Sequence, residues 1–214
     1  MKKVKLLTWL IIGVVIMSVV IFRIFQVNQN LEVTEVLNYN MGEEVSIGSN
    51  YFEDSTELMD GYSITANSAT IYTFDDYLEK INLSSEDAKT LFLEYDDNNF
   101  PDTVYEIELT VRNNNVEITD GGINFFKYSL YGVDYKIQLS SPLFAKLNPT
   151  VNVSQGFIGF SLRPESEMKF FLPFAIRQGN KIKTIDTEKI LNDSIVLPIC
   201  LYPKQKQILI EATQ

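Results

Sequence analysis

The stretch EYDDNNFPD, residues 94–102, gathers side chains that could bind a metal ion. Carboxylate and amide oxygens are the ligands that calcium prefers in proteins. The usual calcium loop, D-x-[DN]-x-[DN]-G, does not fit, because Phe100 and Pro101 stand where a ligand or glycine is needed. The metal therefore stays unknown, no other cofactor is expected, and the candidate ligands are Asp96, Asp97, Asn99 and Asp102.

Nucleophilic catalysis has few candidate residues, because the chain has no His and a single Cys, Cys200. The lack of His excludes Ser-His-Asp and Cys-His pairs and imidazole metal sites. One Cys excludes an intrachain disulfide and any CxxC motif. Ser84 and Ser85 lie near Lys89, but a surface helix offers no desolvated lysine to activate a serine. Ser84 instead fits a helix cap, with Asp87 three residues later.

Paired carboxylates are the remaining route to catalysis, as in a hydrolase of cell-wall glycans. Such a pair needs two acids about 5–9.5 Å apart in a cleft. The linear pattern singles out no pair of this kind. We therefore expect no enzyme, and a carboxylate-dependent cell-wall hydrolase is the alternative.

Charge is distributed unevenly along the chain, whose formal net charge is −10. Residues 40–110 hold 17 acidic and two basic side chains, a net of −15. Nucleic acid is therefore not an expected partner, because phosphate binding needs a basic stripe. An acidic field favours a cationic peptide or a basic patch on another protein. The alternative is an ordinary solvated surface, since strands from both halves of the chain can interleave.

Hydrophobic alternation with a period of two dominates the chain after residue 40 and predicts half-buried strands. In EMKFFLPFAIRQ, for example, every second residue from Met168 to Ile176 is apolar. Pro173 and Pro198 lie inside such patterns, which predicts edge strands or bulges. The other predicted strands are GYSITANSATIYTF, DTVYEIELTVRNNN, GINFFKYSLYG, VDYKIQLS, IVLPICLY and KQILIE.

Helical signals are few, and the clearest is LSSEDAKTLFLEY inside a polar excursion around residues 75–102. Short helical turns are also predicted over 142–147 and 186–191. Seven or eight short antiparallel strands with these turns predict a mostly β fold. The expected architecture is an antiparallel two-sheet sandwich of the immunoglobulin-like kind.

The N-terminal segment has an apolar run from Leu6 to Phe22 behind three lysines. This length approaches the ~20 residues of a transmembrane helix and exceeds the core of a signal peptide. The predicted organisation is a cytoplasmic tip at 1–5, a transmembrane anchor at 6–27, a stalk at 28–40 and a β-sandwich at 41–214. Because the positive side stays inside, we expect a single-pass membrane protein with its C-terminal domain outside.

The segments GEEVSIGSNYF, GYSITANSATI, DTVYEIELTVRNNN and PESEMKFFLPFAI resemble the strand order of immunoglobulin-like, telokin-like domains. Such domains occur on small exported or membrane-anchored proteins of Gram-positive bacteria. The resemblance covers about residues 40–178 and implies an extracytoplasmic binding or accessory domain. It supplies no functional residues.

The expected function is therefore a non-catalytic binding or accessory module for another envelope protein or a cationic peptide. The aromatic runs FFKYSLY and FFLPF either line a groove for peptide or lipid or pack in the core. Alternating aromatic residues in strands favour the core.

Overall fold

The computed structural model describes residues 2–29, 34–95, 100–154, 157–177, 189–190 and 193–213. Side chains between 2 and 29 are described from Ile12 to Gln26. The chain divides into two units, Met1–Thr34 and Glu35–Gln214.

The first unit contains one helix, α1, which spans Lys2–Gln29. Its described side chains are exposed, and Ser18 donates a hydrogen bond to the carbonyl of Val14 at 2.9 Å. Among the helices of the described residues, none is both long and apolar enough to cross a membrane. The prediction of a transmembrane helix over 6–27 is therefore wrong. The segment is helical, as predicted, but the described residues contain no helix that could cross a membrane.

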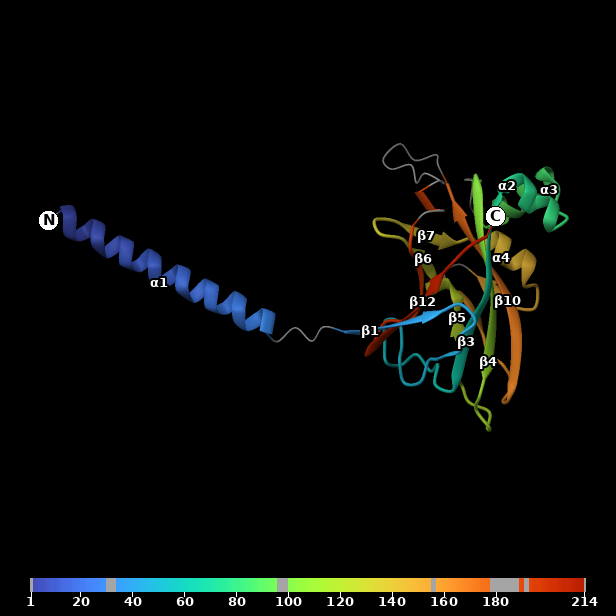
Figure 1. The fold of residues 1–214 in the computed structure, drawn as a ribbon, viewed down its shortest axis with the longest axis horizontal. Helices are drawn as coiled ribbons and strands as arrows, with labels where there is room; N and C mark the ends of the chain where they lie inside the picture. The colour runs from blue at the N-terminus through green and yellow to red at the C-terminus, as the bar shows by residue number, and fades with distance from the viewer. Residues whose placement is uncertain are drawn as a thin grey trace. The chain divides into compact units, whose positions relative to one another are not determined.

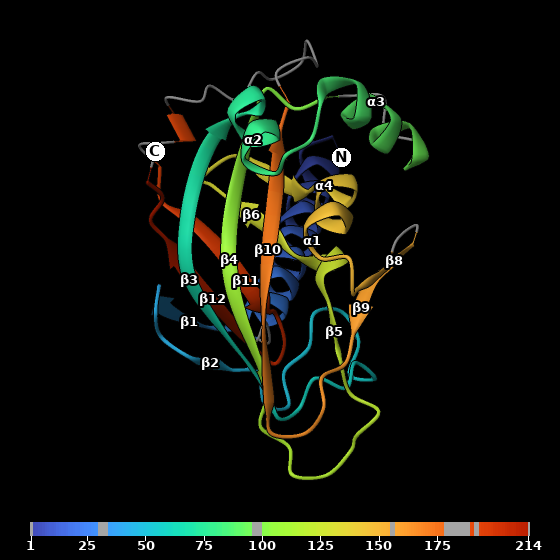
Figure 2. The same ribbon diagram turned by 90° about the vertical axis from the view of Figure 1, so that its right-hand side faces the viewer.

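The second unit is built on a nine-stranded sheet in the order β1-β12-β11-β6-β7-β10-β4-β3-β2 (Figure 1). Three long neighbours, β3, β4 and β10, form its spine through long antiparallel ladders (Figure 2). The strands are β1 (Glu35–Asn40), β2 (Val45–Ser46), β3 (Tyr62–Thr73), β4 (Thr103–Asn113), β6 (Ser129–Tyr131), β7 (Lys136–Leu139), β10 (Ser166–Ile176), β11 (Ile195–Cys200) and β12 (Lys204–Ile210).

This sheet curls until it is nearly closed and barrel-like. At one end Thr213 bridges to Thr70, and the N–H of Ile71 donates to the carbonyl of Thr213 at 2.9 Å. Further along, the ammonium of Lys206 on β12 donates to the carbonyl of Ser46 on β2. Bulges in β3 between Ala66 and Ser68, and in β11 after Pro198, add twist where the sheet bends.

The predicted immunoglobulin-like sandwich is therefore wrong, although the strands themselves were largely predicted. In a sandwich the strands divide between two facing sheets, whereas here nine strands join in one continuous sheet. Alternation cannot distinguish the two architectures, because each strand has one core-facing side in both. Pairing order decides between them, and periodicity carries no information about it.

The core lies inside the curl and contains the alternating face of β10, including Phe170, Leu172 and Phe174. Pro173 lies in a central strand, not at an edge, and its carbonyl accepts from the N–H of Ser140. Pro198 stands at a bulge, as predicted. The structure also places Glu35–Asn40 in the sheet, where the sequence predicted a stalk.

The remaining elements lie against the large sheet. The helices α2 (Phe74–Lys80) and α3 (Ser85–Glu94) form the polar excursion, and α4 (Ser141–Leu147) confirms the helical turn predicted at 142–147. A second small core joins them through Tyr77, Phe92, Val104 and Leu143. A three-stranded sheet has the order β5-β9-β8, with β5 (Ile123–Asn124), β8 (Asn152–Ser154) and β9 (Phe157–Phe160); the 3-10 helix η1 (Phe125–Lys127) follows β5.

Candidate functional site

The sequence-predicted metal ligands fall mostly outside the described residues, since Asp96, Asp97 and Asn99 are not among them. Asp102 is described and directly precedes β4. Its backbone N–H donates to the carbonyl of Ile176 at 2.9 Å, and its carbonyl accepts from the N–H of Phe74 at 3.0 Å. In the described part of the chain, no three His, Cys, Asp or Glu side chains are grouped closely enough to hold a metal.

Ser84 caps α3, as the sequence predicted. Its hydroxyl oxygen accepts a hydrogen bond from the N–H of Asp87 at 3.1 Å and donates to the carboxylate of Asp87 at 2.6 Å. The hydroxyl is thus committed to the start of the helix. Both hydrogen bonds join Ser84 to Asp87, and neither involves a lysine that could activate the hydroxyl. Ser84 is therefore a helix cap and not a nucleophile.

Glu106 is the most buried charged side chain on the spine of the sheet, and two donors from α2 surround its carboxylate. The phenol of Tyr77 donates to it at 2.8 Å, and Lys80 forms an ion pair with it. The ammonium of Lys80 also lies 4.7 Å from the ring centroid of Tyr72 and 5.7 Å from that of Phe171. Burial, with the charge of Glu106, raises the pKa of Tyr77 far above its ordinary value. The phenol of Tyr77 and the ion pair of Lys80 with Glu106 hold α2 against the sheet.

Cys200 is a buried thiol on β11. Burial raises its pKa, so the nucleophilic thiolate is disfavoured at neutral pH. The sulfur lies 3.7 Å from the carbonyl of Lys204, to which the thiol donates. This is a structural cysteine, in agreement with its alternating position in the strand.

A cavity of about 600 Å³ lies on the side of β6 and β7 that faces away from the core. Leu130 and Ile137 point into the core, so their strand neighbours Ser129, Tyr131 and Lys136 point outward into the cavity. We call this the strand groove. Its other lining residues are Phe52, Glu53, Tyr95, Phe126, Lys127, Tyr128, Gln138, Leu139, Ser141, Pro142, Arg177, Pro198 and Leu201.

A second cavity, of about 500 Å³, lies beneath the loop at 52–59 and against β5 and β9. We call it the loop cavity. Its lining includes buried Met59 and Ile123, and Leu58 and Phe157, which also line it, are 58% and 48% exposed. Gly122 is required here, since a Cβ would come within 2.5 Å of the carbonyl oxygen of Phe160. Phe52 and Lys127 line both cavities, so the two cavities adjoin at these side chains.

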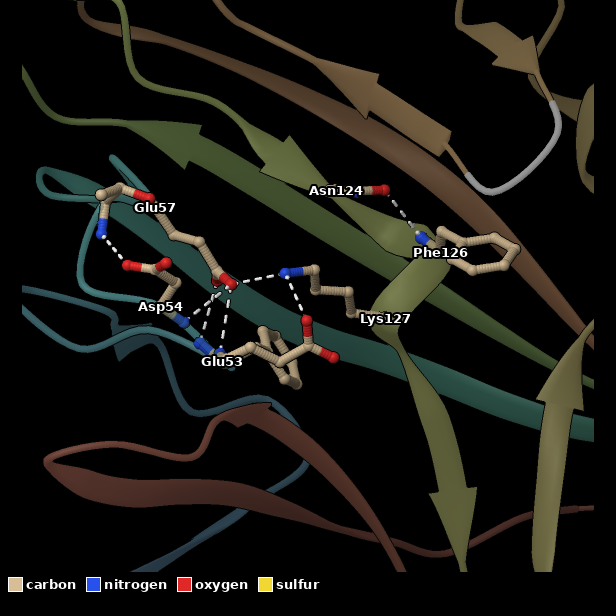
Figure 3. Close-up of polar contacts among 8 residues, drawn as sticks. Glu53, Asp54, Glu57, Asn124, Phe126 and Lys127 are labelled. Atoms are coloured by element: carbon tan, nitrogen blue, oxygen red, sulfur yellow. Dashed lines mark hydrogen bonds and ion pairs between the residues drawn. The ribbon is translucent and has the colours of Figure 1, made fainter.

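A knot of hydrogen bonds on Glu57 fixes the loop that separates the cavities (Figure 3). The carboxylate accepts from the backbone N–H groups of Phe52 at 2.9 Å, Glu53 at 3.1 Å and Asp54 at 3.4 Å. The ammonium of Lys127 lies 2.5 Å from Glu57 and 3.3 Å from Glu53. Lys127 belongs to η1, so the knot ties the loop to the wall of the strand groove.

The residue before Lys127 points the other way. The ring of Phe126 lies on the side away from the two carboxylates, while the side-chain oxygen of Asn124 accepts from its backbone N–H at 3.1 Å (Figure 3). The same oxygen of Asn124 accepts from the N–H of Ile158 at 3.1 Å. One amide therefore fixes β5, η1 and β9 together and leaves the ring of Phe126 half exposed at the strand groove.

Electrostatics hold the knot in its charged form. Burial raises the pKa of Glu57, but hydrogen bonds from Lys127 and from the N–H groups of Phe52 and Glu53 outweigh it and leave the pKa below its ordinary value. Burial lowers the pKa of Lys127, and its hydrogen bonds to Glu57 and Glu53 outweigh that effect, so this pKa is raised. Both groups are therefore ionised at neutral pH.

Glu53 and Glu57 are the two carboxylates that approach one ammonium between the cavities, so they are the pair to weigh for glycan hydrolysis. A general acid must be protonated at the working pH, which requires a raised pKa. Glu57 has a lowered pKa, and four donors occupy its oxygens. The side chain of Glu53 is 76% exposed. The arrangement suits a structural ion pair better than catalysis.

Sequence reasoning found part of this site. The run FFKYSLY was expected either to pack in the core or to line a groove, and its residues do both. Phe125 and Tyr128 are buried, whereas Phe126 and Tyr131 line the strand groove and are 50% and 39% exposed. The sequence carries no signal that separates them, because the 3-10 turn η1 places Phe125 and Tyr128 on the same side. The role of Glu57 was missed, because its donors are backbone groups that no sequence pattern marks.

The chain was compared with known proteins. A family model described as a domain of unknown function, DUF5028, matches residues 36–206. No curated protein and no solved structure matches the chain. The lining residues of the strand groove and the loop cavity all fall inside the matched range.

Proposed function

The chain belongs to the DUF5028 family, and from this premise we propose that it is a non-catalytic binding module. Its ligand is an extended peptide segment of another protein, which lies along the strand groove. The observation that carries the proposal is this groove, about 600 Å³ with aromatic side chains at its mouth. Clefts of 300–1,000 Å³ with aromatic walls and a few polar groups are the usual form of a binding site.

The rings at the groove supply the binding energy. Phe126 is 50% exposed and Tyr131 is 39% exposed in the free protein. Covering apolar surface contributes about 25 cal/mol per Å², and rigid aromatic side chains are common anchors of peptide ligands. Lys136 stands 5.5 Å from the centroid of the Tyr131 ring and adds a charge at the same place.

The groove's charges favour a segment that carries an acidic side chain. Among its lining residues, Lys127 is already paired with the acid Glu53, whereas Lys136 lies beside the ring of Tyr131. A partner segment with carboxylates would therefore meet complementary charge. The cationic peptide predicted as an alternative partner depends on the acidic residues of 40–110 and stays a prediction, as does a location outside the cytoplasm.

A hydrolase is the less supported alternative. It would require a protonated carboxylic acid beside the groove, and the environment of Glu57 stabilises the ionised form. The buried phenol of Tyr128 does not substitute for it, because burial raises its pKa well above the ordinary value. No other observation favours catalysis at this site.

Site-specific photocrosslinking of the full chain, in the cells that natively make it, tests the proposal. A photoreactive phenylalanine replaces Phe126 or Tyr131 in the groove, and Ile118 in the control. Ile118 is 90% exposed and lines neither cavity. We expect the same adduct from both groove positions and none from the control.

The crosslinked segment, made as a synthetic peptide, should bind the purified full chain. Phe126→Ala should weaken this binding about tenfold, as expected for an aromatic anchor worth ~1.4 kcal/mol. Ile118→Ala should leave it unchanged. Equal adducts at the groove and at the control, or a peptide that binds Phe126→Ala as well as the natural chain, would refute the proposal.

A further inference from the structure

The two ends of the nine-stranded sheet are protected very differently. β2 ends the sheet on one side and contains only two residues, Val45 and Ser46. The ammonium of Lys206 donates to the carbonyls of Ser46 and of Ile47, at 2.5 and 3.2 Å. A lysine at a short edge strand is a common device against unwanted strand pairing.

β1 ends the sheet on the other side and has no such protection. It pairs with β12 in parallel over Glu35–Asn40, and in the described part of the chain no strand pairs with its other side (Figure 2). At its last residue, the N–H of Asn40 donates to the carboxylate of Glu43 at 2.9 Å, and the carbonyl of Asn40 accepts from the N–H of Glu43 at 3.2 Å. The strand contains no Lys and no Pro. A row of backbone donors and acceptors is therefore open to a further strand.

The side chains of β1 also leave it open. Positions 36, 38 and 40 are exposed, 37 and 39 are half-buried, and Val36 is 47% exposed. The one charge, Glu35, pairs with Lys204 at 2.7 Å, so the strand from Val36 to Asn40 is neutral. These five residues therefore present no charge to an approaching strand.

We propose that β1 pairs edge to edge with β1 of a second copy of this chain, as two antiparallel strands that join both sheets. A second copy fits because two molecules of equal net charge repel least where neither carries an unpaired charge. When β1 pairs with β1 of the second copy, the free backbone N–H and C=O groups of both strands are hydrogen-bonded at once. No open edge of this kind remains, so the assembly stops at a two-fold dimer. This inference does not depend on the strand groove as a binding site.

Cysteine crosslinking of the full chain tests the inference. Single cysteines replace each residue from Glu35 to Asn40 in a Cys200→Ser background, and the control is Val133→Cys, at a position that is 82% exposed. In a two-fold antiparallel pair, equivalent residues move apart by about 7 Å for each step away from the axis. Disulfides do not form when the Cα atoms are more than about 7 Å apart. We therefore expect oxidation to give dimers at one position or two adjacent ones.

A lysine variant provides the second measurement. Val36→Lys places a charge on the edge of both copies and should lower the peak dimer yield about fivefold or more. Val133→Lys should not change it. A yield that is flat from 35 to 40, a yield no higher than at Val133→Cys, or a peak that Val36→Lys leaves unchanged would overturn the inference.

Discussion

Replacing Glu57 with Gln tests the physical account of the knot between the two cavities. Gln has nearly the same shape as Glu but carries no charge, and one acceptor oxygen becomes a donor amide. In the native chain both oxygens are used, by three backbone N–H groups and by Lys127. The substitution therefore leaves the ammonium without its closest carboxylate and turns an N–H group toward another donor.

The size of the effect follows from the burial of the site. A hydrogen bond to a charged group contributes about 1.5–3 kcal/mol. The side chain of Glu57 is 17% exposed, and Gln keeps one oxygen, so we take one such bond as lost. We expect the free energy of unfolding to fall by about 2 kcal/mol. For a domain of this size the melting temperature should fall by about 4–8 °C.

The pH dependence gives an independent test. The pKa of Glu57 is lower in the folded chain than in the unfolded chain, where it takes its ordinary value. Its contribution is thus complete above the unfolded pKa of ~4.3 and is lost as the pH falls through the folded pKa. The stability gap between the natural chain and Glu57→Gln should be full at neutral pH and shrink as the pH falls from the unfolded pKa of ~4.3 through the lower folded pKa.

Urea unfolding of the full chain, followed by tyrosine fluorescence at several pH values, measures this gap. Glu53→Gln is the matched control, since Glu53 is 76% exposed and touches the same ammonium at 3.3 Å. The control should cost no more than about 0.5 kcal/mol. A loss for Glu57→Gln as small as that of the control, or a gap that does not change with pH, would refute the reasoning.

Two further predictions concern the rest of the sheet. Glu106→Ala should lower the free energy of unfolding by about 3 kcal/mol, because it leaves Lys80 without its buried partner. The control is Glu108→Ala, which should lower it by less than ~1 kcal/mol, because Glu108 pairs with Lys169, which is 67% exposed. Equal losses in urea unfolding would contradict this difference in burial. Cys200 should resist thiol-reactive dyes at pH 8 in the native chain and react within minutes in urea, since burial raises its pKa. Rapid labelling of the native chain would show that the thiol is accessible.

Local structure was largely predictable because it depends on neighbouring residues. The ends of β4 and β10, the apolar face of β10 and the Ser84 cap of α3 follow from periodicity and spacing within one segment. The bulge at Pro198 follows from a residue that cannot donate to a ladder. Weak elements were missed: β1 lies in a segment read as a stalk, and β8 and β9 lack a strong alternation.

The candidate site was less predictable because its parts come from distant segments. Glu57 and Lys127 are 70 residues apart, and neither residue type marks the other as its partner. Within FFKYSLY, the short 3-10 turn places Phe125 and Tyr128, three residues apart, both in the core. A repeat of two would place these two side chains on opposite faces.

The sequence alone determined that this chain builds a mostly β domain, that its strands have one apolar side, and that imidazole and disulfide chemistry are excluded. These properties depend only on the composition of the chain or on the spacing of residues within a short segment. Only the tertiary structure decided that the strands form one curled sheet, that Glu57 is saturated by donors, and that β1 is left as an open edge. Those outcomes depend on which strand pairs with which, a choice made by contacts between residues far apart in the chain.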